Sequence, residues 1–332
     1  MRGPEKTPKT TILGGGAWGT ALALAALHAG HHVRLWARDG EIAKAITKGK
    51  NPRYLPGIAF DTGIEATTDL QTALDQTDCV LSVTPAQSLR MVLNEIRAHM
   101  PANIPLVLCA KGIERETGAL LSAIVTEILP KAPVAVLSGP SFATDVARGL
   151  PTAVVVAAQD DALAMDLAAR FSARNLRCYA STDIIGVELG GALKNVFAIA
   201  AGAVAGAELG ASAQAAMVTR GFVELRRLGV VFGAQPETLM GLSGLGDLLL
   251  TCSSTQSRNF AYGVALGRGE VLEGLPLAEG VPTAAIAARL AAQHGVEAPI
   301  LSAVAAILAG VITVHEAVEA LMTRPLKHEN LI

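Results

Sequence analysis

The chain has 332 residues, which is enough for about two ordinary domains. Hydrophobic residues make up 51% of it and charged residues only 17%, against a usual value of about 25%, so the composition predicts a globular protein and excludes a disordered one. The formal net charge is -2, and lysines and arginines do not cluster in runs. The sequence therefore argues against nucleic acid as a partner.

The cysteines and the apolar stretches bear on localisation. The four cysteines are scattered, without a Cys-x-x-Cys pair or a histidine at metal-ligand spacing, which predicts reduced thiols in a cytoplasmic protein and no metal site. The polar N-terminus lacks the apolar core of a signal peptide. The apolar stretches 196–207 and 299–314 are shorter than the ~18 to 20 residues that span a bilayer. We therefore expect no membrane span but buried helices; an exposed apolar helix face would favour a homodimer.

Residues 10–30 have the pattern of a strand, a glycine turn and a helix. Gly14, Gly16 and Gly19 match G-x-G-x-x-G, and a second strand is expected at 32–37. In this motif the first glycine makes the turn, the second lets the backbone approach a pyrophosphate, and the third packs helix on strand. Glycine turns also occur for packing alone, but the strand on either side favours dinucleotide binding.

The end of the second strand bears on the choice of cofactor. Arg38 would neutralise the 2′-phosphate of NADP(H), whereas Asp39 would bind the ribose of NAD(H) if the strand ended one or two residues later. Together they favour NADP(H) or dual use. A solvated turn pair with no role in binding is the alternative.

Further strands are expected at 79–83, 106–110, 134–137, 152–156 and 176–179, with helices at 87–99 and 161–173. After residue 182 only helical patterns follow, at 184–227, 236–250, 258–268, 282–293, 300–309 and 314–322. The sequence thus predicts an α/β protein with a Rossmann-like, doubly wound, mainly parallel sheet at 1–187 and an all-helical domain at 188–332. Because ligands bind beyond the carboxyl ends of such strands, Pro85, Lys111, Gly139 and Ser141 are expected near the nicotinamide. Ser141 is equally interpretable as a helix N-cap.

Lys194 is the candidate for the chemistry. It stands before an uncharged run that continues to Glu208, so it is either a flexible surface lysine at a helix end or a lysine held for a purpose. Between 241 and 259, glycines are expected to bring Asp247 up in a tight loop, and Arg258 and Asn259 follow several hydroxyl residues. Such donors suit a phosphate monoester. A polar loop with an Asp N-cap and a surface arginine is the alternative.

Five blocks of sequence together resemble the bacterial-type NAD(P)-dependent glycerol-3-phosphate dehydrogenases. They are GGGAWGTALA at 14–23, KGIE at 111–114, SGPSFA at 138–143, ELGGALKNV at 188–196 and GLGD to SRN at 244–259. They occur in family order along nearly the whole chain. The resemblance implies an oxidoreductase that interconverts sn-glycerol 3-phosphate and dihydroxyacetone phosphate with NADPH or NADH, and that supplies glycerol 3-phosphate for phospholipid synthesis.

The resemblance also implies residue roles. Lys194 is the general base or acid, and its pKa should be lowered by burial and by a neighbouring cation such as Lys111 or Arg258. The catalytic set is Lys194, Lys111 and Asp247. The substrate site is Lys111, Gly139, Ser141, Lys194, Asp247, Ser257, Arg258 and Asn259. Besides the three glycines, the cofactor site is Ala17, Trp18, Arg38, Tyr54, Lys111, Ala143, Arg258, Leu277 and Glu279.

The sequence departs from the family pattern at Gly15, where Ala or Ser is usual and little change is expected, and at 277–283, where Pro282 is expected to start a helix. Two alternatives stay open. A hydroxyacid or 6-phosphogluconate-type dehydrogenase would share the glycine loop and the lysine, although Arg258 and Asn259 favour glycerol 3-phosphate. A catalytically silent nucleotide sensor would keep the glycine loop but could lose Lys194 and Asp247.

Overall fold

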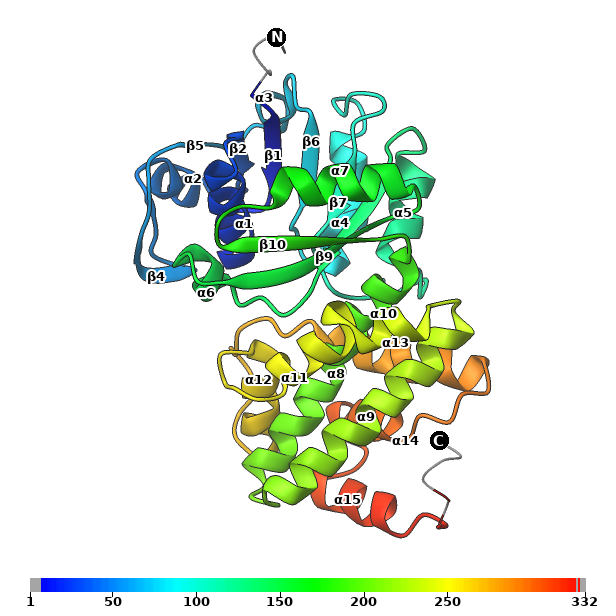
Figure 1. Ribbon diagram of the computed structural model, residues 1–332. Coiled ribbons are helices and arrows are strands. Elements are labelled where there is room, and N and C mark those ends of the chain that lie inside the picture. Colours follow the sequence, from blue (N-terminus) through cyan, green and yellow to red (C-terminus); the bar gives the residue numbers. More distant parts are fainter. Residues whose placement is uncertain (1–6, 327, 329–332) are drawn as a thin grey trace. The chain divides into compact units, whose positions relative to one another are not determined.

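The computed structural model describes residues 7–326 and 328. The chain divides into two compact units (Figure 1), of which the first is Met1–Ala110 with Leu121–Ile184 and the second is Lys111–Leu120 with Ile185–Ile332. The segment Lys111–Leu120 therefore belongs to the second unit, although residues of the first unit flank it on both sides along the chain. The sequence pattern did not predict that this segment belongs to the second unit.

The first unit contains an eight-stranded sheet in the order β10-β9-β8-β7-β6-β1-β2-β5. All neighbouring strands are parallel except β8 and β9. The bounds are β1 Lys9–Leu13, β2 His32–Trp36, β5 Ile64–Thr67, β6 Cys79–Ser82, β7 Leu106–Leu108, β8 Val134–Ser138, β9 Thr152–Ala158 and β10 Leu176–Ser181. The strand order reverses at β1, which is where such sheets bind ligands. The predicted mainly parallel, doubly wound sheet is confirmed.

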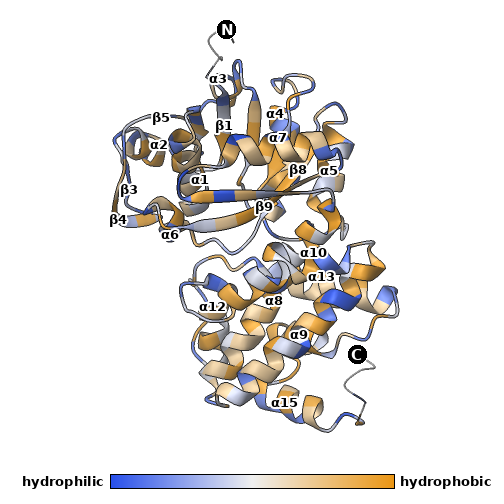
Figure 2. Cartoon of the chain, in the orientation of Figure 1, coloured by the Kyte–Doolittle hydropathy of each residue, from blue (hydrophilic) through white to orange (hydrophobic). Residues whose placement is uncertain are grey.

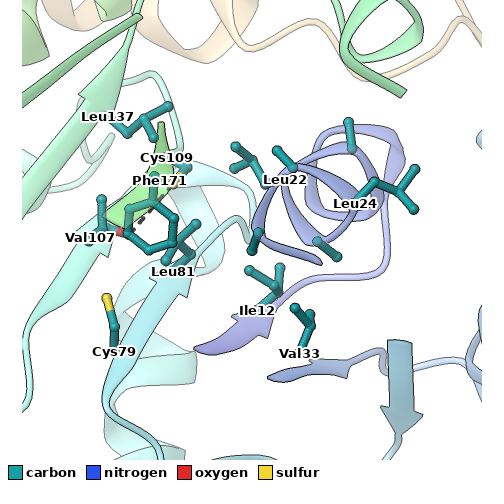
Figure 3. Close-up of a cluster of buried hydrophobic side chains, with 14 of the residues drawn as sticks. Ile12, Leu22, Leu24, Val33, Cys79, Leu81, Val107, Cys109, Leu137 and Phe171 are labelled. Carbon is teal, nitrogen blue, oxygen red and sulfur yellow. Dashed lines mark hydrogen bonds between the residues drawn. The ribbon is translucent and has the colours of Figure 1, made fainter. Parts of the chain in front are cut away.

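The core of the first unit is an apolar layer between the sheet and its helices. Ile12, Leu81 and Val107 come from three neighbouring strands, and Leu22 and Leu24 come from α1 (Figure 3). The helices are α1 Ala17–His28, α2 Gly40–Thr47, α3 Leu70–Leu74, α4 Leu89–Ile96, α5 Leu121–Ile128, α6 Ala143–Ala147 and α7 Asp161–Phe171, with a 3-10 turn, η1, at Ala86–Ser88. Apolar residues dominate the inner strand β8 of this sheet (Figure 2), as burial on both faces requires.

Three short strands were not predicted from the sequence. β3 Lys50–Asn51 and β4 Leu55–Ala59 form a separate antiparallel pair, and β5 lies at the edge of the main sheet. In β5 only Ile64 is buried, so the strand has no alternating apolar pattern. A short edge strand pairs through its backbone, and this gives little signal in the side chains.

The second unit is helical, as predicted, but the long helix expected at 184–227 is two helices. α8 ends at Gly206 because Glu208 and Gly210 have φ angles of 55° and 88°. The Leu209 N–H donates to the Val204 carbonyl, as in a Schellman motif. The helices are α8 Ile184–Gly206, α9 Ala211–Val231, α10 Pro236–Met240, α11 Asp247–Thr251, α12 Arg258–Gly267, α13 Gly280–Gln293, α14 Pro299–Leu308 and α15 Val314–Met322.

The expected helix at 236–250 is also interrupted, because Leu242–Gly246 forms a π-helical turn between α10 and α11. A Cβ atom at Gly244 would lie 1.9 Å from the carbonyl oxygen of Leu239, so only glycine fits there. The expectation of a tight loop before Asp247 is therefore wrong, since the π-helical turn leads directly into α11, whose first residue is Asp247. π-turns inside helices are frequent at functional sites.

α8 is long and apolar enough to cross a membrane by length and composition, and it is longer than the apolar stretch considered from the sequence. It has 23 residues, and 94% of its most apolar window is buried in the structure. The central helix of a folded helical unit has the same properties. α8 is accordingly the core of the second unit.

A buried carboxylate joins α9 to α14. Glu224 is 3% exposed and accepts hydrogen bonds from the backbone N–H groups of Ile300, at 2.8 Å, and Leu301, at 3.0 Å. It thereby caps α14, whose own N-cap residue is an alanine. Burial raises the pKa of Glu224 to about 7, although the two N–H groups oppose this. The sequence pattern around Glu224 does not single this residue out.

Candidate active site

Lys194 is buried in the second unit. Its residue is 6% exposed, and its Nζ donates at 2.6 Å to Asp247 Oδ1 and at 2.6 Å to Thr251 Oγ1. The position follows from α8 itself, because the surrounding apolar residues bury the helix on nearly every side. The alternative of a flexible surface lysine is therefore wrong.

Asp247 is shared between two lysines. Its other oxygen, Oδ2, accepts from Lys111 Nζ at 2.6 Å, and the side chain of Asp247 is only 1% exposed. A buried carboxylate is stable only when it is paired, and here two ammonium groups pair with it. The three groups carry a net charge of +1, which suits an anionic substrate. The alternative of a polar loop with an Asp N-cap is wrong for Asp247, which is buried and is not the N-cap of α11, whereas the surface arginine of that alternative agrees with the exposed Arg258.

Burial lowers the pKa of Lys194 to about 8. The Asp247 carboxylate raises it, and the Lys111 ammonium lowers it again. For Asp247, burial alone would raise the pKa, but the charges of Lys111 and Lys194 outweigh burial and keep it below its usual value. An amine with a pKa of about 8 can exchange a proton near physiological pH beside an ionised carboxylate, which is the pairing that acid–base catalysis needs.

Thr251 is part of this site and was missed in the sequence analysis. Its hydroxyl group lies 3.2 Å from Asp247 Oδ1 and accepts the hydrogen bond from Lys194. The signal that could have found it is the spacing, since residues four apart lie on one face of a helix such as α11. Asp247 and Thr251 together fix the position of the lysine amine.

The segment 257–259 forms the start of α12. Ser257 is the N-cap, with its Oγ accepting from the Phe260 N–H at 3.3 Å, and Arg258 is exposed. The Asn259 amide is engaged at both ends: its Nδ2 donates to Asn195 Oδ1 at 2.9 Å, and its Oδ1 accepts from the Gly280 N–H at 2.9 Å. Asn195, like Thr251, was not identified from the sequence.

The segment at 277–283 leads into α13. Leu277 is 51% exposed, Glu279 is the N-cap residue, and the helix begins at Gly280. The expectation that Pro282 starts the helix is wrong by two residues. Glu279 also accepts a hydrogen bond on its backbone oxygen from Thr283 Oγ1 at 2.7 Å.

The glycine loop of the first unit has the geometry that a dinucleotide needs. Gly14 has a φ of 131°, and a Cβ on Gly19 would lie 1.8 Å from the Gly14 oxygen, so both positions require glycine. A Cβ on Gly16 would meet nothing within 4 Å, and the N-terminus of α1 has no side-chain cap. The loop therefore offers open space and free N–H groups for a pyrophosphate. Ala17 and Trp18 are the first two residues of α1.

Gly15 matters more than expected from the sequence. A Cβ at this position would lie 2.7 Å from the Cβ of Ala37 and 3.2 Å from Ile42 Cγ2. We expected little difference between glycine and the usual alanine or serine at position 15. That expectation is wrong for this chain, because Ala37 and Ile42 fill the space that a side chain at position 15 would need.

Arg38 and Asp39 follow β2, which ends at Trp36 and not later. Asp39 is the N-cap of α2, and its Oδ1 accepts from the Glu41 N–H at 2.9 Å. Its carboxylate is thus engaged, whereas Arg38 is exposed. Tyr54 is 43% exposed, with the Arg53 guanidinium 5.4 Å from its ring centroid.

Gly139, Ser141 and Ala143 follow β8 in the first unit. Gly139 has a φ of 151°, and a Cβ there would lie 2.9 Å from Val154 Cα. Ser141 Oγ donates to the Gly139 oxygen at 3.0 Å, and the N-cap of α6 is Phe142. The alternative that Ser141 caps a helix is therefore wrong.

The expected site residues fall into two groups, one in each unit. The first unit holds Gly14, Gly16, Ala17, Trp18, Gly19, Arg38, Tyr54, Gly139, Ser141 and Ala143, and the second holds Lys111, Lys194, Asp247, Ser257, Arg258, Asn259, Leu277 and Glu279. Hydrogen bonds join Lys111, Lys194 and Asp247 directly. Among residues 7–326 and 328, no group of three or more His, Cys, Asp or Glu side chains could hold a metal ion.

Two family models match the chain. Residues 9–164 match the N-terminus of NAD-dependent glycerol-3-phosphate dehydrogenase, and residues 183–319 match its C-terminus. The chain belongs to the NAD-dependent glycerol-3-phosphate dehydrogenase family. The resemblance seen in the sequence is confirmed, and membership in this family decides against the hydroxyacid alternative.

Relatives of this glycerol-3-phosphate dehydrogenase family member match it over nearly its full length. The glycerol-3-phosphate dehydrogenase [NAD(P)+] of Mesorhizobium japonicum is 76% identical and covers 97% of this chain and 94% of its own. The glycerol-3-phosphate dehydrogenase [NAD(P)+] of Brucella canis is 59% identical, and the match covers 97% of this chain and 99% of the Brucella chain. The crystal structure of glycerol-3-phosphate dehydrogenase from Coxiella burnetii has a TM-score of 0.91 at 39% identity, covering 97% of this chain and 100% of that one.

Proposed function

We propose that this protein interconverts sn-glycerol 3-phosphate and dihydroxyacetone phosphate, with NADP(H) or NAD(H) as the redox partner. The observation that carries the proposal is the buried Lys194, held at 2.6 Å by Asp247 and with a pKa of about 8. A lysine in this state exchanges a proton with a substrate oxygen at neutral pH. Membership in the family supplies the substrate class.

The residues of the second unit have distinct roles in this reaction. Lys194 donates its proton to the C2 oxygen of the ketone and takes it back from the alcohol. Asp247 and Thr251 hold the amine in place, and Lys111 contributes the second positive charge beside it. A bound NADPH or NADH supplies the hydride. The proposed substrate site consists of Lys111, Gly139, Ser141, Lys194, Asp247, Ser257, Arg258 and Asn259.

The exposed Arg258 at the start of α12 suits a phosphate group, because a guanidinium holds phosphate oxygens bidentately. The proposed cofactor site consists of Gly14, Gly16, Ala17, Trp18, Gly19, Arg38, Tyr54, Lys111, Ala143, Arg258, Leu277 and Glu279. Within it, Arg38 binds the 2′-phosphate of NADP(H). The support is that Asp39, the competing ribose ligand, already caps α2.

The reducing direction supplies glycerol 3-phosphate for phospholipid synthesis in the cytoplasm, and this setting is part of the proposal. The four cysteines support it, since all are buried and none forms a disulfide, as is usual in a reducing compartment. A homodimer also belongs to the proposal. The exposed apolar side chains of Val230, Val231 and Met240, near the end of α9 and in α10, support it.

The test of the function is to mix the purified protein with dihydroxyacetone phosphate and to follow the nicotinamide absorbance with NADPH and NADH in parallel. We expect both to be oxidised, with a higher kcat/KM for NADPH. Arg38→Ala should raise the KM for NADPH by about 10-fold, as expected for the loss of a charge-assisted contact, and change that for NADH little. No oxidation of either cofactor would refute the function, and equal effects of Arg38→Ala on both would remove Arg38 from the 2′-phosphate.

The pH dependence should differ between the two directions. Reduction needs protonated Lys194, so its kcat/KM should fall as the pH rises through about 8, the pKa of this amine. Oxidation of glycerol 3-phosphate needs the neutral amine, so its kcat/KM should rise with pH and level off above about 8. Initial rates in both directions between pH 6 and 10 test this. The same slope in both directions would contradict the role of Lys194.

A further inference from the structure

Two asparagine amides beside Lys194 form a hydrogen-bonded chain that ends at a backbone N–H. The N–H of Gly280 donates to Asn259 Oδ1, and Asn259 Nδ2 donates to Asn195 Oδ1, both at 2.9 Å. A backbone N–H can only donate, so the end of Asn259 that faces Gly280 must be its oxygen. The other end is then the NH2 group, and Asn195 must face it with its own oxygen. Gly280 thus fixes the orientation of both amides.

Gly280 can hold this position because it has no side chain. A Cβ atom there would lie 2.5 Å from the carbonyl oxygen of Asn195 and 2.8 Å from Ile199 Cδ1. α13 begins at Gly280, and the first turn of α13 therefore lies directly on the backbone of α8 at Asn195, the residue after Lys194. Any other residue would push the N–H away from Asn259.

The open end of this chain is a hydrogen-bond donor. Asn195 is 5% exposed, and within the part of the chain that the structure describes its Nδ2 donates to no acceptor. An NH2 group recognises an acceptor such as a carbonyl or phosphate oxygen. If the amide were reversed, Asn195 would present an oxygen and repel these groups.

We propose that Gly280 is a positioning residue that acts through Asn259 to turn the NH2 group of Asn195 toward an oxygen of the phosphorylated substrate. This role of Gly280 rests on the function proposed above. Gly280 is not among the substrate-site or cofactor-site residues of that proposed function. Gly280 itself touches neither the substrate nor the reacting atoms; its effect passes through the two amides.

A double-mutant cycle on kcat/KM for dihydroxyacetone phosphate tests this chain of contacts. Gly280→Ala and Asn195→Ala should each lower kcat/KM by about 10- to 100-fold, the effect of losing one hydrogen bond to a charged or polarised oxygen. In the double variant the loss should equal that of Asn195→Ala alone, because Gly280 then has no amide left to orient. Two effects that multiply would overturn the proposal, since a merely structural role acts independently of Asn195.

Gly206→Ala is the matched control. Its Cβ would lie 2.2 Å from the Val264 oxygen, a similar collision, but it is eleven residues or roughly 16 Å along α8 from Asn195. It should lower the melting temperature without changing kcat/KM. Should Gly280→Ala fail to fold, Asn259→Ala replaces it in the cycle. Because Asn259 also belongs to the proposed substrate site, its effect should shrink, not vanish, in the Asn195→Ala background, and an equal effect in both backgrounds would overturn the proposal. A wild-type protein that does not turn over dihydroxyacetone phosphate refutes the proposed function, whereas turnover with multiplying effects refutes only the role of Gly280.

Discussion

Lys194→Met is expected to lower kcat in both directions by about 10³- to 10⁴-fold, at the upper end of what a positioned acid or base contributes. Methionine keeps much of the apolar stem that lies in α8 and removes only the amine that Asp247 and Thr251 hold. Asp247 keeps Lys111 as a partner, so the buried carboxylate is not left unpaired. Steady-state rates with dihydroxyacetone phosphate and NADPH measure the effect.

Lys194→Arg is the informative control. It restores the positive charge, but a guanidinium remains protonated at all ordinary pH values and is a poor proton donor. If Lys194 transfers a proton, this variant should be nearly as slow as Lys194→Met. Near-normal turnover would mean that the site needs only a charge. The affinity for NADPH, measured by fluorescence, should stay within about threefold of wild type, because the glycine loop belongs to the first unit.

Asp247→Asn should damage both activity and stability. The neutral amide leaves the ammonium groups of Lys111 and Lys194 without their shared carboxylate, and breaking such a buried pair costs about 3 to 5 kcal/mol. We expect a lower melting temperature and a kcat reduced by at least about 100-fold, because Lys194 loses the group that orients it. The pKa of Lys194 should fall further, since the Asp247 carboxylate raises it in the wild type. The pH profile of any remaining activity should therefore shift to lower pH.

Glu65→Gln provides the comparison for this variant. Glu65 also pairs with two basic side chains, His32 and Arg34, but it is 59% exposed. Exposed pairs contribute little, so its melting temperature and kcat should both stay close to wild type. If the two variants lost the same stability, burial would not be the reason for the importance of Asp247.

The fold could largely be predicted from the sequence because most of its strands are buried on both faces. Such strands leave apolar runs between glycines, and the run at 134–137 corresponds to β8. The edge strand β5 has only one buried residue and left no such run. The break between α8 and α9 depends on the backbone of Glu208, a non-glycine residue with a φ of 55°. The sequence around Glu208 does not predict this left-handed conformation.

The sequence predicted those residues of the candidate site whose residue type alone indicates the chemistry. Lys194 stood out as a lysine in an apolar run, and burial does lower its pKa. Thr251 and Asn195 did not stand out, because a threonine or an asparagine is ordinary in sequence and acquires a role only through its neighbours in space. The pairing of Asp247 with Lys111 spans 136 residues, a contact that the fold creates and local patterns do not contain.

That long-range pairing has a consequence for how the protein is made. The chain passes between its two units at residues 110, 120 and 184, so a cut at any single point leaves one unit incomplete. A fragment that begins at Ile185 would lack Lys111 and also the segment whose Gly118 packs against Arg289 and Leu290. During synthesis, Lys111 leaves the ribosome long before Asp247 exists. The cluster of Lys111, Lys194 and Asp247 can therefore form only after residue 247 has been made, and a product that is truncated before this residue lacks the cluster.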